Sequence, residues 1–458
     1  MKRLLSLLFV LALVFALVPA PAAAEGEAQS YLLIANGNKL PKGLVKQVEK
    51  AGGVVTQGFG EIGIAVVESS QGNFKGQAAN FKGVRAVVPN LTVQWVEPVE
   101  QVAVSDVASP PFTGDDDFYF DLQWGHDAVD APEAWNAGLR GAGVKVAVLD
   151  GGFDLDHPDL MPNINYGLSK DFTGEGLQYT LPDTFSHGTH TAGTVAAADN
   201  AFGTIGVAPE AKLVLVKVLG DAGSGSFDDV IAGILYAAEV DADVINMSLG
   251  ARLVKSGDPD DPDGEYTAKE AAELKNAIGR ATTYAYQQGV TVIASAGNDG
   301  EDYDHNANVI HLPSDAPHVI SISATTPIGW AVDPDNADLD YPTSYTNYGQ
   351  SSIDFAAPGG DVLYPGSEIC QVGPIVHYCF VFDLVFSTGN GGWYWSGGTS
   401  MSAPHAAGVS ALIIGDHGGE MKPAQVEAAL RQLADDLGKP GKDDFYGLGA
   451  IDAFNGND

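Results

Sequence analysis

The stretch at residues 398–405 reads Gly-Thr-Ser-Met-Ser-Ala-Pro-His and leads into a run of small and apolar residues that ends near Leu412. Such a run predicts a buried helix with Ser400 at its start. A serine at this position is usually a helix cap. Ser400 can act as a nucleophile only if other parts of the chain supply a base and a carboxylate that orients the base.

Two other segments carry these residue types. Residues 143–149, Gly-Val-Lys-Val-Ala-Val-Leu, are a buried-strand run that places Asp150 at the carboxyl end of the strand, where open α/β sheets hold functional groups. Residues 186–193, Ser-His-Gly-Thr-His-Thr-Ala-Gly, open a small-residue helix with His187 at its start. The two histidines could instead bind zinc, but Gly188 stands where a zinc peptidase needs its general-base Glu.

The chain around these motifs has two kinds of pattern. From Trp124 onward, glycine-bounded apolar runs alternate with helical patterns: strands near 144–150, 213–218, 243–247, 290–295 and 318–323, and helices near 227–239 and 267–288. This alternation predicts a parallel β-sheet with helices on both faces. Residues 31–97 alternate apolar stretches with two short helix-like runs, which predicts a small α+β unit in front of it.

The chain order Asp, His, Ser and the residues that flank each of the three resemble those of the subtilisin-like serine proteases, or subtilases. The resemblance covers about residues 124–453 and implies a subtilisin-like parallel sheet. It implies that Ser400 is the nucleophile, His187 the general base and Asp150 the carboxylate that fixes the histidine tautomer. Residues 31–97 resemble the inhibitory propeptide of the same family.

The same resemblance extends to the substrate site. Residues 294–298, Ala-Ser-Ala-Gly-Asn, match the family segment whose asparagine stabilises the oxyanion, so Asn298 is the expected oxyanion-hole residue. Its alternative is a turn residue before Asp299 and Gly300. The resemblance assigns substrate binding to two pocket walls, made of Ser248, Leu249, Gly250, Ala294, Ser295 and Ala296.

Recognition through the substrate backbone implies broad specificity. The small wall residues leave room for a large apolar side chain, whereas Asp299 and Asp302 near the pocket rim would favour Lys or Arg. Both preferences stay open. Insertions at 251–266 and 361–395 distinguish the chain from the simplest relatives and leave the pocket geometry open as well.

A structural calcium ion is the cofactor that the resemblance implies. Residues 198–204 have the family's length for a calcium loop, which a carboxylate equivalent to Asp159 completes, so Asp159 and Asn200 are the expected ligands. Carboxylate, amide and carbonyl oxygens suit calcium. The acidic insertion at 258–265 is a second candidate, equally consistent with a solvated linker.

The start of the chain has the layout of a signal peptide, with a basic beginning, an apolar run and a small-residue exit near Ala24. A membrane anchor is the alternative, but the run is short and Pro19 and Pro21 interrupt it. We expect a signal peptide at 1–24, a propeptide at 25–100, an exposed linker at 101–121 and a catalytic domain at 122–458. The product would then be secreted and not inserted in a membrane.

The net charge is strongly negative, at −36 for 59 acidic and 23 basic residues. Residues 25–100 contribute nothing to it, because their acidic and basic residues are equal in number. Such a surface repels nucleic acid and anionic membranes. It also attracts divalent cations, although a solubilising role explains it equally well. Cys370 and Cys379 lie close together in an exported chain, which favours a disulfide over free thiols.

These features together predict a secreted, monomeric serine endopeptidase of broad specificity that matures from its own precursor. Its partners would be protein or peptide substrates and its own propeptide as an intramolecular inhibitor. An inactive relative that serves as a scaffold and an esterase with the same triad are the alternatives. The presence of Asp150, His187, Ser400 and Asn298 speaks against the first.

Overall fold

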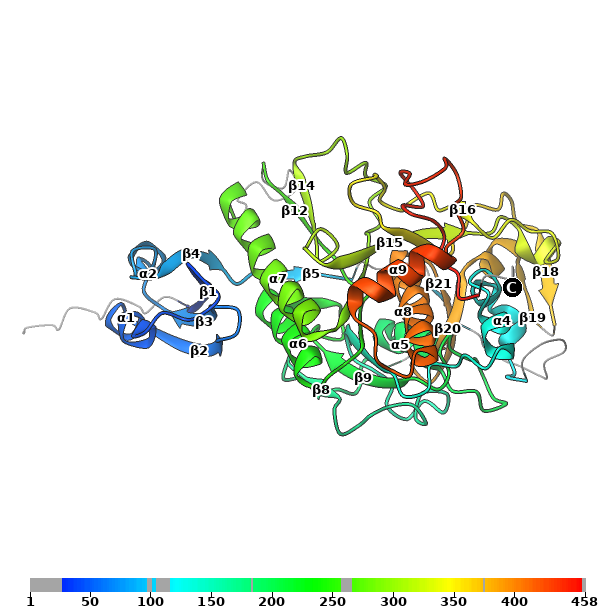
Figure 1. Cartoon of the computed structure of the whole chain (residues 1–458), viewed down its shortest axis with the longest axis horizontal. Helices are drawn as coiled ribbons and strands as arrows, with labels where there is room; N and C mark the ends of the chain where they lie inside the picture. Colours follow the sequence, from blue (N-terminus) through cyan, green and yellow to red (C-terminus); the bar gives the residue numbers. More distant parts are fainter. Residues whose placement is uncertain are drawn as a thin grey trace, which may run out of the picture.

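The computed structural model describes residues 27–96, 101–103, 116–182, 184–256, 266–373 and 375–454. They form a small α+β unit followed by a larger α/β body (Figure 1). The expected signal peptide at 1–24 and the acidic insertion at 258–265 lie outside the described residues. Within the described residues, no helix combines the length and the apolar character needed to cross a membrane.

The small unit is a four-stranded antiparallel sheet with the order β2-β3-β1-β4. Its elements are β1 (Gln29–Ala35), α1 (Leu44–Lys50), β2 (Gly53–Phe59), β3 (Ile64–Ser69), α2 (Phe74–Ala78) and β4 (Val84–Pro89). Alternate residues of β1 pack in opposite directions, because side chains of a strand alternate between its faces. Leu33 packs with α1 and α2, whereas Leu32 and Ile34 join the core of the larger body. The sequence prediction of an α+β unit is confirmed.

The larger body is built on an eight-stranded, mainly parallel sheet with the order β16-β15-β13-β11-β7-β9-β8, in which β17 also pairs with β15. Its strands are β7 (Lys145–Asp150), β8 (Lys170–Asp171), β9 (Lys212–Lys217), β11 (Val244–Met247), β13 (Thr291–Ser295), β15 (Val319–Thr326), β16 (Tyr341–Pro342) and β17 (Phe355–Pro358). Only the short β16 pairs antiparallel. The five strands expected from the sequence all lie in this sheet.

Helices cover both faces of this sheet. On one face, Ala147 and Leu149 of β7 pack with α6 (Phe227–Glu239) and α7 (Ala268–Gln288). On the other face, Val146 and Val148 pack with α5 (His187–Ala196), α8 (Thr399–Asp416) and α9 (Pro423–Leu433). The strands are buried on both sides, which explains their continuous apolar sequences. The predicted arrangement of sheet and helices is confirmed.

Shorter elements surround the sheet. They are β5 (Thr92–Gln94), β6 (Gln101–Ala103), η1 (Phe120–Leu122), α3 (Trp124–Asp127), α4 (Ala131–Asn136), β10 (Ser224–Ser226), β12 (Ala251–Val254), β14 (Val309–Leu312) and η2 (Trp330–Val332). The insertion before α8 adds β18 (Ile369–Val372), β19 (Ile375–Tyr378), η3 (Cys379–Asp383), β20 (Val385–Gly389) and β21 (Gly392–Ser396). The predicted disulfide between Cys370 and Cys379 is present and ties β18 to η3.

The insertion packs against the helix that begins with His187. Ser387 and Thr388 of β20 donate hydrogen bonds to the carbonyl oxygens of His190 (3.0 Å) and Thr189 (2.8 Å) in α5. These contacts are buried. The insertion therefore supports α5 from the side.

The notion of an exposed linker over 101–121 is wrong at its second end, from Asp117 to Asp121, whereas Gln101 and Ala103 at its first end are exposed but belong to a strand. Residues 101–103 form β6, which pairs with β21. Asp117 and Tyr119 are buried, because the aromatic rings next to Asp117 pack among those of the insertion. Residues 104–115 lie outside the described residues.

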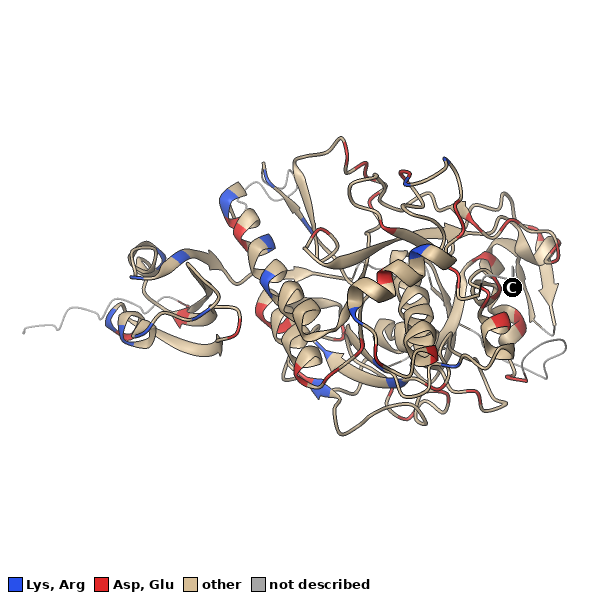
Figure 2. Ribbon diagram, viewed as in Figure 1, with Lys and Arg blue, Asp and Glu red and all other residues tan. Residues whose placement is uncertain are grey.

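Charge is distributed unevenly between the two parts. Figure 2 shows both signs on the small unit and on α7, while the rest of the larger body shows mainly Asp and Glu. This agrees with the sequence, in which residues 25–100 carry no net charge.

Candidate active site

Three chain segments bring the predicted triad to the carboxyl edge of the sheet. Asp150 is the last residue of β7, His187 is the first residue of α5 and Ser400 is the second residue of α8. Ser248, directly after β11, donates from its hydroxyl to the Ser400 carbonyl (2.7 Å). This bond fixes the start of α8 beside β11, which is the neighbour of β7 in the sheet.

Asp150 holds the imidazole of His187. The Nδ1 atom of His187 lies 2.9 Å from both carboxylate oxygens of Asp150, which is fully buried. The Gly151 amide (2.7 Å) and the Thr191 hydroxyl (3.2 Å) also donate to this carboxylate. Because an ionised carboxylate only accepts, the tautomer of the neutral ring that fits this contact has its proton on Nδ1 and the lone pair on Nε2. Among the described residues, this buried Nε2 has no hydrogen-bond partner.

The hydroxyl of Ser400 donates to the carbonyl oxygen of Ser248 at 3.2 Å rather than to His187. Ser400 is 7% exposed, so its hydroxyl is partly open to the cavity described below. Catalytic hydrogen bonds are often long or differently directed before substrate binds. Rotation about χ1 of Ser400 redirects the hydroxyl without moving the helix.

Asn298 is held by its oxygen, so that its amide nitrogen is left for another partner. Its Oδ1 accepts from the backbone amide (2.9 Å) and the hydroxyl (2.8 Å) of Thr399. Asn298 and Ser400 line the same cavity. The Ser400 amide lies in the first turn of α8, where backbone N–H groups have no partner within the helix. The two N–H groups are the donors that an oxyanion requires.

A cavity of about 210 Å³ opens beside these groups. Its lining comes from several segments: Trp95, Gly250, Arg252, Ser295, Gly297, Asn298, Asp299, His311, Thr399 and Ser400. Of the six residues predicted to bind substrate, only Gly250 and Ser295 belong to the lining. The other four, Ser248, Leu249, Ala294 and Ala296, are buried at 0–1% exposure and form the support behind the walls.

The predicted rim is also different. Asp299 lines the cavity, but Asp302 does not, because its carboxylate accepts from the backbone amide of Asp304 and from His305 on the surface. Sequence reasoning missed Arg252 and His311. Neither belongs to a motif, and β12 and β14 bring them together by pairing over residues 251–254 and 309–312.

The chain's own segment 92–96 lies beside the cavity, and Trp95 belongs to the cavity lining. Strand β5 pairs antiparallel with β10, and the Gly250 amide donates to the Trp95 carbonyl (2.8 Å). The Trp95 indole donates to the Gly225 carbonyl (2.9 Å), and its ring packs on Phe227 with centroids 4.8 Å apart. An extended segment between two backbone edges has the geometry of strand addition.

The sequence model of the subtilase family matches residues 141–449. The chain belongs to the subtilase family. It is 37% identical to an intracellular serine protease of Paenibacillus polymyxa, over 63% of this chain and 72% of that protein. It is 34% identical to Subtilisin Savinase of Lederbergia lenta, over 72% of this chain and 97% of that protein. This subtilase is therefore a serine endopeptidase.

Solved structures share the fold of this subtilase over most of its chain. The epidermin leader peptide processing serine protease of Staphylococcus aureus superposes with a TM-score of 0.71 at 23% identity, covering 93% of this chain and 97% of that one. At this identity the likeness concerns the fold alone. Because one relative is named as intracellular, family membership does not decide the compartment.

The second histidine of the His187 motif has its own partner. His190 is fully buried and its Nε2 lies 3.1 Å from the Tyr394 carbonyl, while His187 is bound to Asp150. Burial lowers the pKa of His190 to about 3, so its ring stays neutral. The two rings are thus separately engaged, which does not favour the zinc alternative.

The predicted calcium ligands come from two segments, Asp159 from the stretch after β7 and Asn200 from the 198–204 loop, and they differ in how well they fit. Asp159 is fully buried, and its Oδ2 accepts from the Thr204 amide and the Trp393 indole, each at 2.8 Å. Its Oδ1 has no hydrogen-bond partner among the described residues, so one buried carboxylate oxygen remains for a cation. Asn200 is exposed, with its amide nitrogen 3.5 Å from the Pro158 carbonyl. Asp159 therefore fits a calcium site better than Asn200 does.

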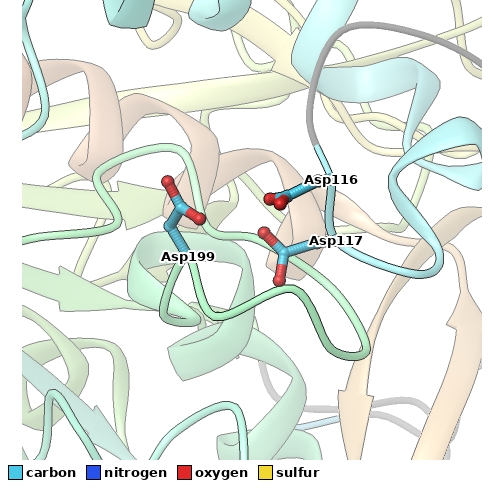
Figure 3. A group of neighbouring side chains, drawn as sticks. All are labelled: Asp116, Asp117 and Asp199. Atoms are coloured by element: carbon cyan, nitrogen blue, oxygen red, sulfur yellow. The ribbon is translucent and has the colours of Figure 1, made fainter.

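Three further carboxylates gather at the same loop. Asp116, Asp117 and Asp199 place one oxygen each within 4.8 Å of one another (Figure 3). Asp117 also accepts from the backbone amides of Asn200 (3.2 Å) and Phe202 (3.1 Å), and Arg140 pairs with Asp199. The two amides and the Arg140 guanidinium offset part of the negative charge of Asp117 and Asp199.

Proposed function

We propose that this subtilase hydrolyses peptide bonds with Ser400 as nucleophile, His187 as general base and Asp150 as the carboxylate that orients the base. The observation that carries the proposal is the imidazole of His187, which is bound to Asp150 through Nδ1 and whose Nε2 has no partner in the described part of the chain. In the first step the Ser400 oxygen forms a bond to the substrate carbonyl carbon while Nε2 takes the hydroxyl proton.

The negative oxygen of the resulting tetrahedral intermediate accepts hydrogen bonds from the Asn298 side chain and the Ser400 amide. Asp150 stabilises the imidazolium that forms. His187 then gives its proton to the leaving amine as the peptide bond breaks, and an acyl-enzyme remains on Ser400. Water, activated by the same histidine, hydrolyses this ester and restores the hydroxyl.

Labelling with a fluorophosphonate tests this proposal directly. The full chain should become labelled on Ser400 and hydrolyse casein, and Ser400→Ala should abolish labelling and reduce kcat about a millionfold, as in subtilisin itself. Ser402→Ala is the matched control, because Ser402 lies one half-turn further on the same helix and is fully buried. A Ser400→Ala enzyme with a tenth of the wild-type rate contradicts the assignment.

We further propose that residues 25–100 act as an inhibitory propeptide. The support is the segment 92–96, which lies along β10 and Gly250 where an extended substrate would bind. The small unit also contacts α6 and α7, through Asn90 with Asp228 (2.8 Å) and Arg85 with Glu273 (3.2 Å). The groove is thus occupied as long as the small unit stays attached and docked.

Maturation by self-cleavage and secretion complete the proposal. The first cut would fall between residues 97 and 118, made by Ser400, after export directed by residues 1–24. In a protease-free host, Ser400→Ala should accumulate as a proform that lacks only the signal peptide. Normal processing of this variant would exclude self-maturation, and retention of the wild-type product in the cell would exclude secretion.

A structural calcium ion at the 198–204 loop belongs to the same proposal, with Asp159 as its principal ligand. The observation that supports it is the buried Oδ1 of Asp159, which has no hydrogen-bond partner within the ranges that the structure describes. The ion would stabilise the loop that follows α5 and would take no part in the reaction.

A further inference from the structure

The cavity next to Ser400 is closed at its buried end by His311. A Cβ atom added at Gly250 would lie 2.6 Å from Nε2 of His311, and one added at Gly297 would lie at the same distance from the same atom. The imidazole therefore lies between the two walls, and any residue larger than glycine at position 250 or 297 would clash with it. His311 is 4% exposed and comes from β14.

Glycine is required at Gly297 for a second reason. Its φ is 101°, a conformation that side chains disfavour. The ring of His311 thus uses space that the wall glycines would otherwise leave to a substrate side chain. A large aromatic side chain entering from Ser400 would meet the imidazole edge instead of an open pocket.

The imidazole presents Nε2 toward the walls while Nδ1 is fixed behind it. Nδ1 lies 3.0 Å from the hydroxyl of Ser314, which can donate or accept. Burial is the largest effect on His311 and lowers its pKa, although nearby carboxylates oppose this. A lowered pKa favours the neutral ring, in which Nε2 can accept from or donate to a polar group, depending on how the Ser314 hydroxyl turns.

The charged residues of the cavity compensate one another. Arg252 lies 3.7 Å from Asp299 and also forms an ion pair with Glu301. Asn347 donates to the other oxygen of Asp299 (3.3 Å). The carboxylate of Asp299 is therefore already paired. The expectation that an acidic rim selects Lys or Arg requires an unpaired carboxylate, and Asp299 does not supply one in this cavity.

We propose that His311 determines the side-chain preference of this protease, and that the residue preceding the cleaved bond is an uncharged polar one of medium length, such as glutamine, in preference to a large aromatic one. The inference rests on the proposed function, because it assigns the cavity to that substrate side chain. A medium-length amide reaches the imidazole and hydrogen-bonds to Nε2, while a phenyl or indole ring would have to displace it.

Peptides that differ only in the residue before the cleaved bond test this proposal. The active product of the full chain should be compared on Gln, Phe, Leu, Lys and Glu peptides, with its concentration set by fluorophosphonate titration. We expect kcat/KM for Gln to exceed that for Phe by tenfold or more, since a missing polar partner or a steric clash in a pocket has effects of at least this size.

Variants separate the role of His311 from general damage. His311→Gly should open the pocket and change the Gln/Phe ratio at least tenfold toward Phe. His311→Asn, which keeps a hydrogen-bonding group in a smaller side chain, should retain a preference for Gln. His305→Gly is the matched control because its side chain is 83% exposed, and it should leave the ratio unchanged.

Three results overturn the proposal: a wild-type preference for Phe, Leu, Lys or Glu over Gln, an unchanged ratio in His311→Gly, or an equal change in His305→Gly. Because the rates are ratios within one titrated enzyme, partial loss of folding in a variant does not imitate a change of preference. A wild-type chain that neither takes the label nor cleaves any of the peptides overturns the proposed function itself.

Discussion

At the scale of single residues, the site depends on which atom of a side chain is already engaged. Asp150 occupies Nδ1 of His187 and thereby leaves Nε2 for proton transfer. Thr399 occupies Oδ1 of Asn298 and thereby leaves the amide nitrogen for the proposed oxyanion contact. In both cases a neighbouring group fixes the orientation of the side chain to which the proposal gives a catalytic role.

Asn298→Leu should lower kcat by about a hundred- to a thousandfold with little change in KM, a range known from the corresponding loss in subtilisin. The amide stabilises charge that develops only in the transition state, so substrate binding should be almost unaffected. Steady-state kinetics on one peptide measures both constants. An effect confined to KM would contradict the oxyanion role.

At the scale of elements, two helices of the catalytic body form the contact with the small unit. Arg280 of α7 donates to the carbonyl oxygens of Ala35, Gly37 and Ile62, at 3.0 to 3.1 Å. Lys75 and Glu270 form an ion pair across the same boundary. These contacts lie far along the chain from β5, so they can be changed without altering the segment in the groove.

Arg280→Ala should weaken inhibition by a separately added chain of residues 25–100, raising its inhibition constant about tenfold or more. The substitution removes the charged donor of three hydrogen bonds to carbonyl oxygens. Hydrogen bonds from a charged group contribute about 1.5–3 kcal/mol each at most. Arg431→Ala on α9 is the control. Equal inhibition of the Arg280→Ala and wild-type enzymes would show that docking on α7 is unimportant.

At the scale of the whole molecule, the excess of acidic residues places some carboxyl groups close to other carboxylates. Burial and these neighbours disfavour the charged form of such groups. Burial, followed by Asp338, Asp435 and Asp130, raises the pKa of Asp340 to about 7. Burial, followed by Asp130 and Asp435, likewise raises the pKa of Asp452 to about 7. The protonated form of each group is therefore favoured by folding.

Stability from these groups is present below the ordinary Asp pKa of about 3.8 and is lost as pH rises through about 7. Asp340→Asn removes the charge and should raise the Tm at pH 8 by about 2 °C, as expected for about 1 kcal/mol in a domain of this size. The gain should be smaller at pH 5. Asp335→Asn, an exposed neighbour, is the control for calorimetry at both pH values. A gain independent of pH would exclude this explanation.

The proposed calcium site predicts that calcium raises the Tm of this protein, because an ion that binds the folded loop and not the unfolded chain stabilises the folded state. Excess chelator should lower the Tm, and Asp159→Asn should reduce the response while keeping an oxygen for the Thr204 and Trp393 donors. Asp156→Asn, an exposed change nearby, should respond like the wild type. A melting curve that does not respond to chelator would remove the calcium proposal.

The sequence by itself determined the fold class and predicted the proposed triad and Asn298, because local patterns indicate each of them. Continuous apolar runs specify strands buried on both faces, and short motifs at the ends of these strands specify chemistry. It also predicted the disulfide between Cys370 and Cys379 from their spacing.

Only the tertiary structure decided what surrounds these residues. The pairing of β12 with β14 brings Arg252 and His311 to the cavity. These residues are 59 positions apart, and a local sequence pattern does not predict a contact over that separation. The same holds for the first end of the expected linker, where residues 101–103 of β6 pair with residues 394–396 of β21. Local sequence specifies elements and their buried faces, whereas the neighbours of a side chain depend on which distant elements pack together.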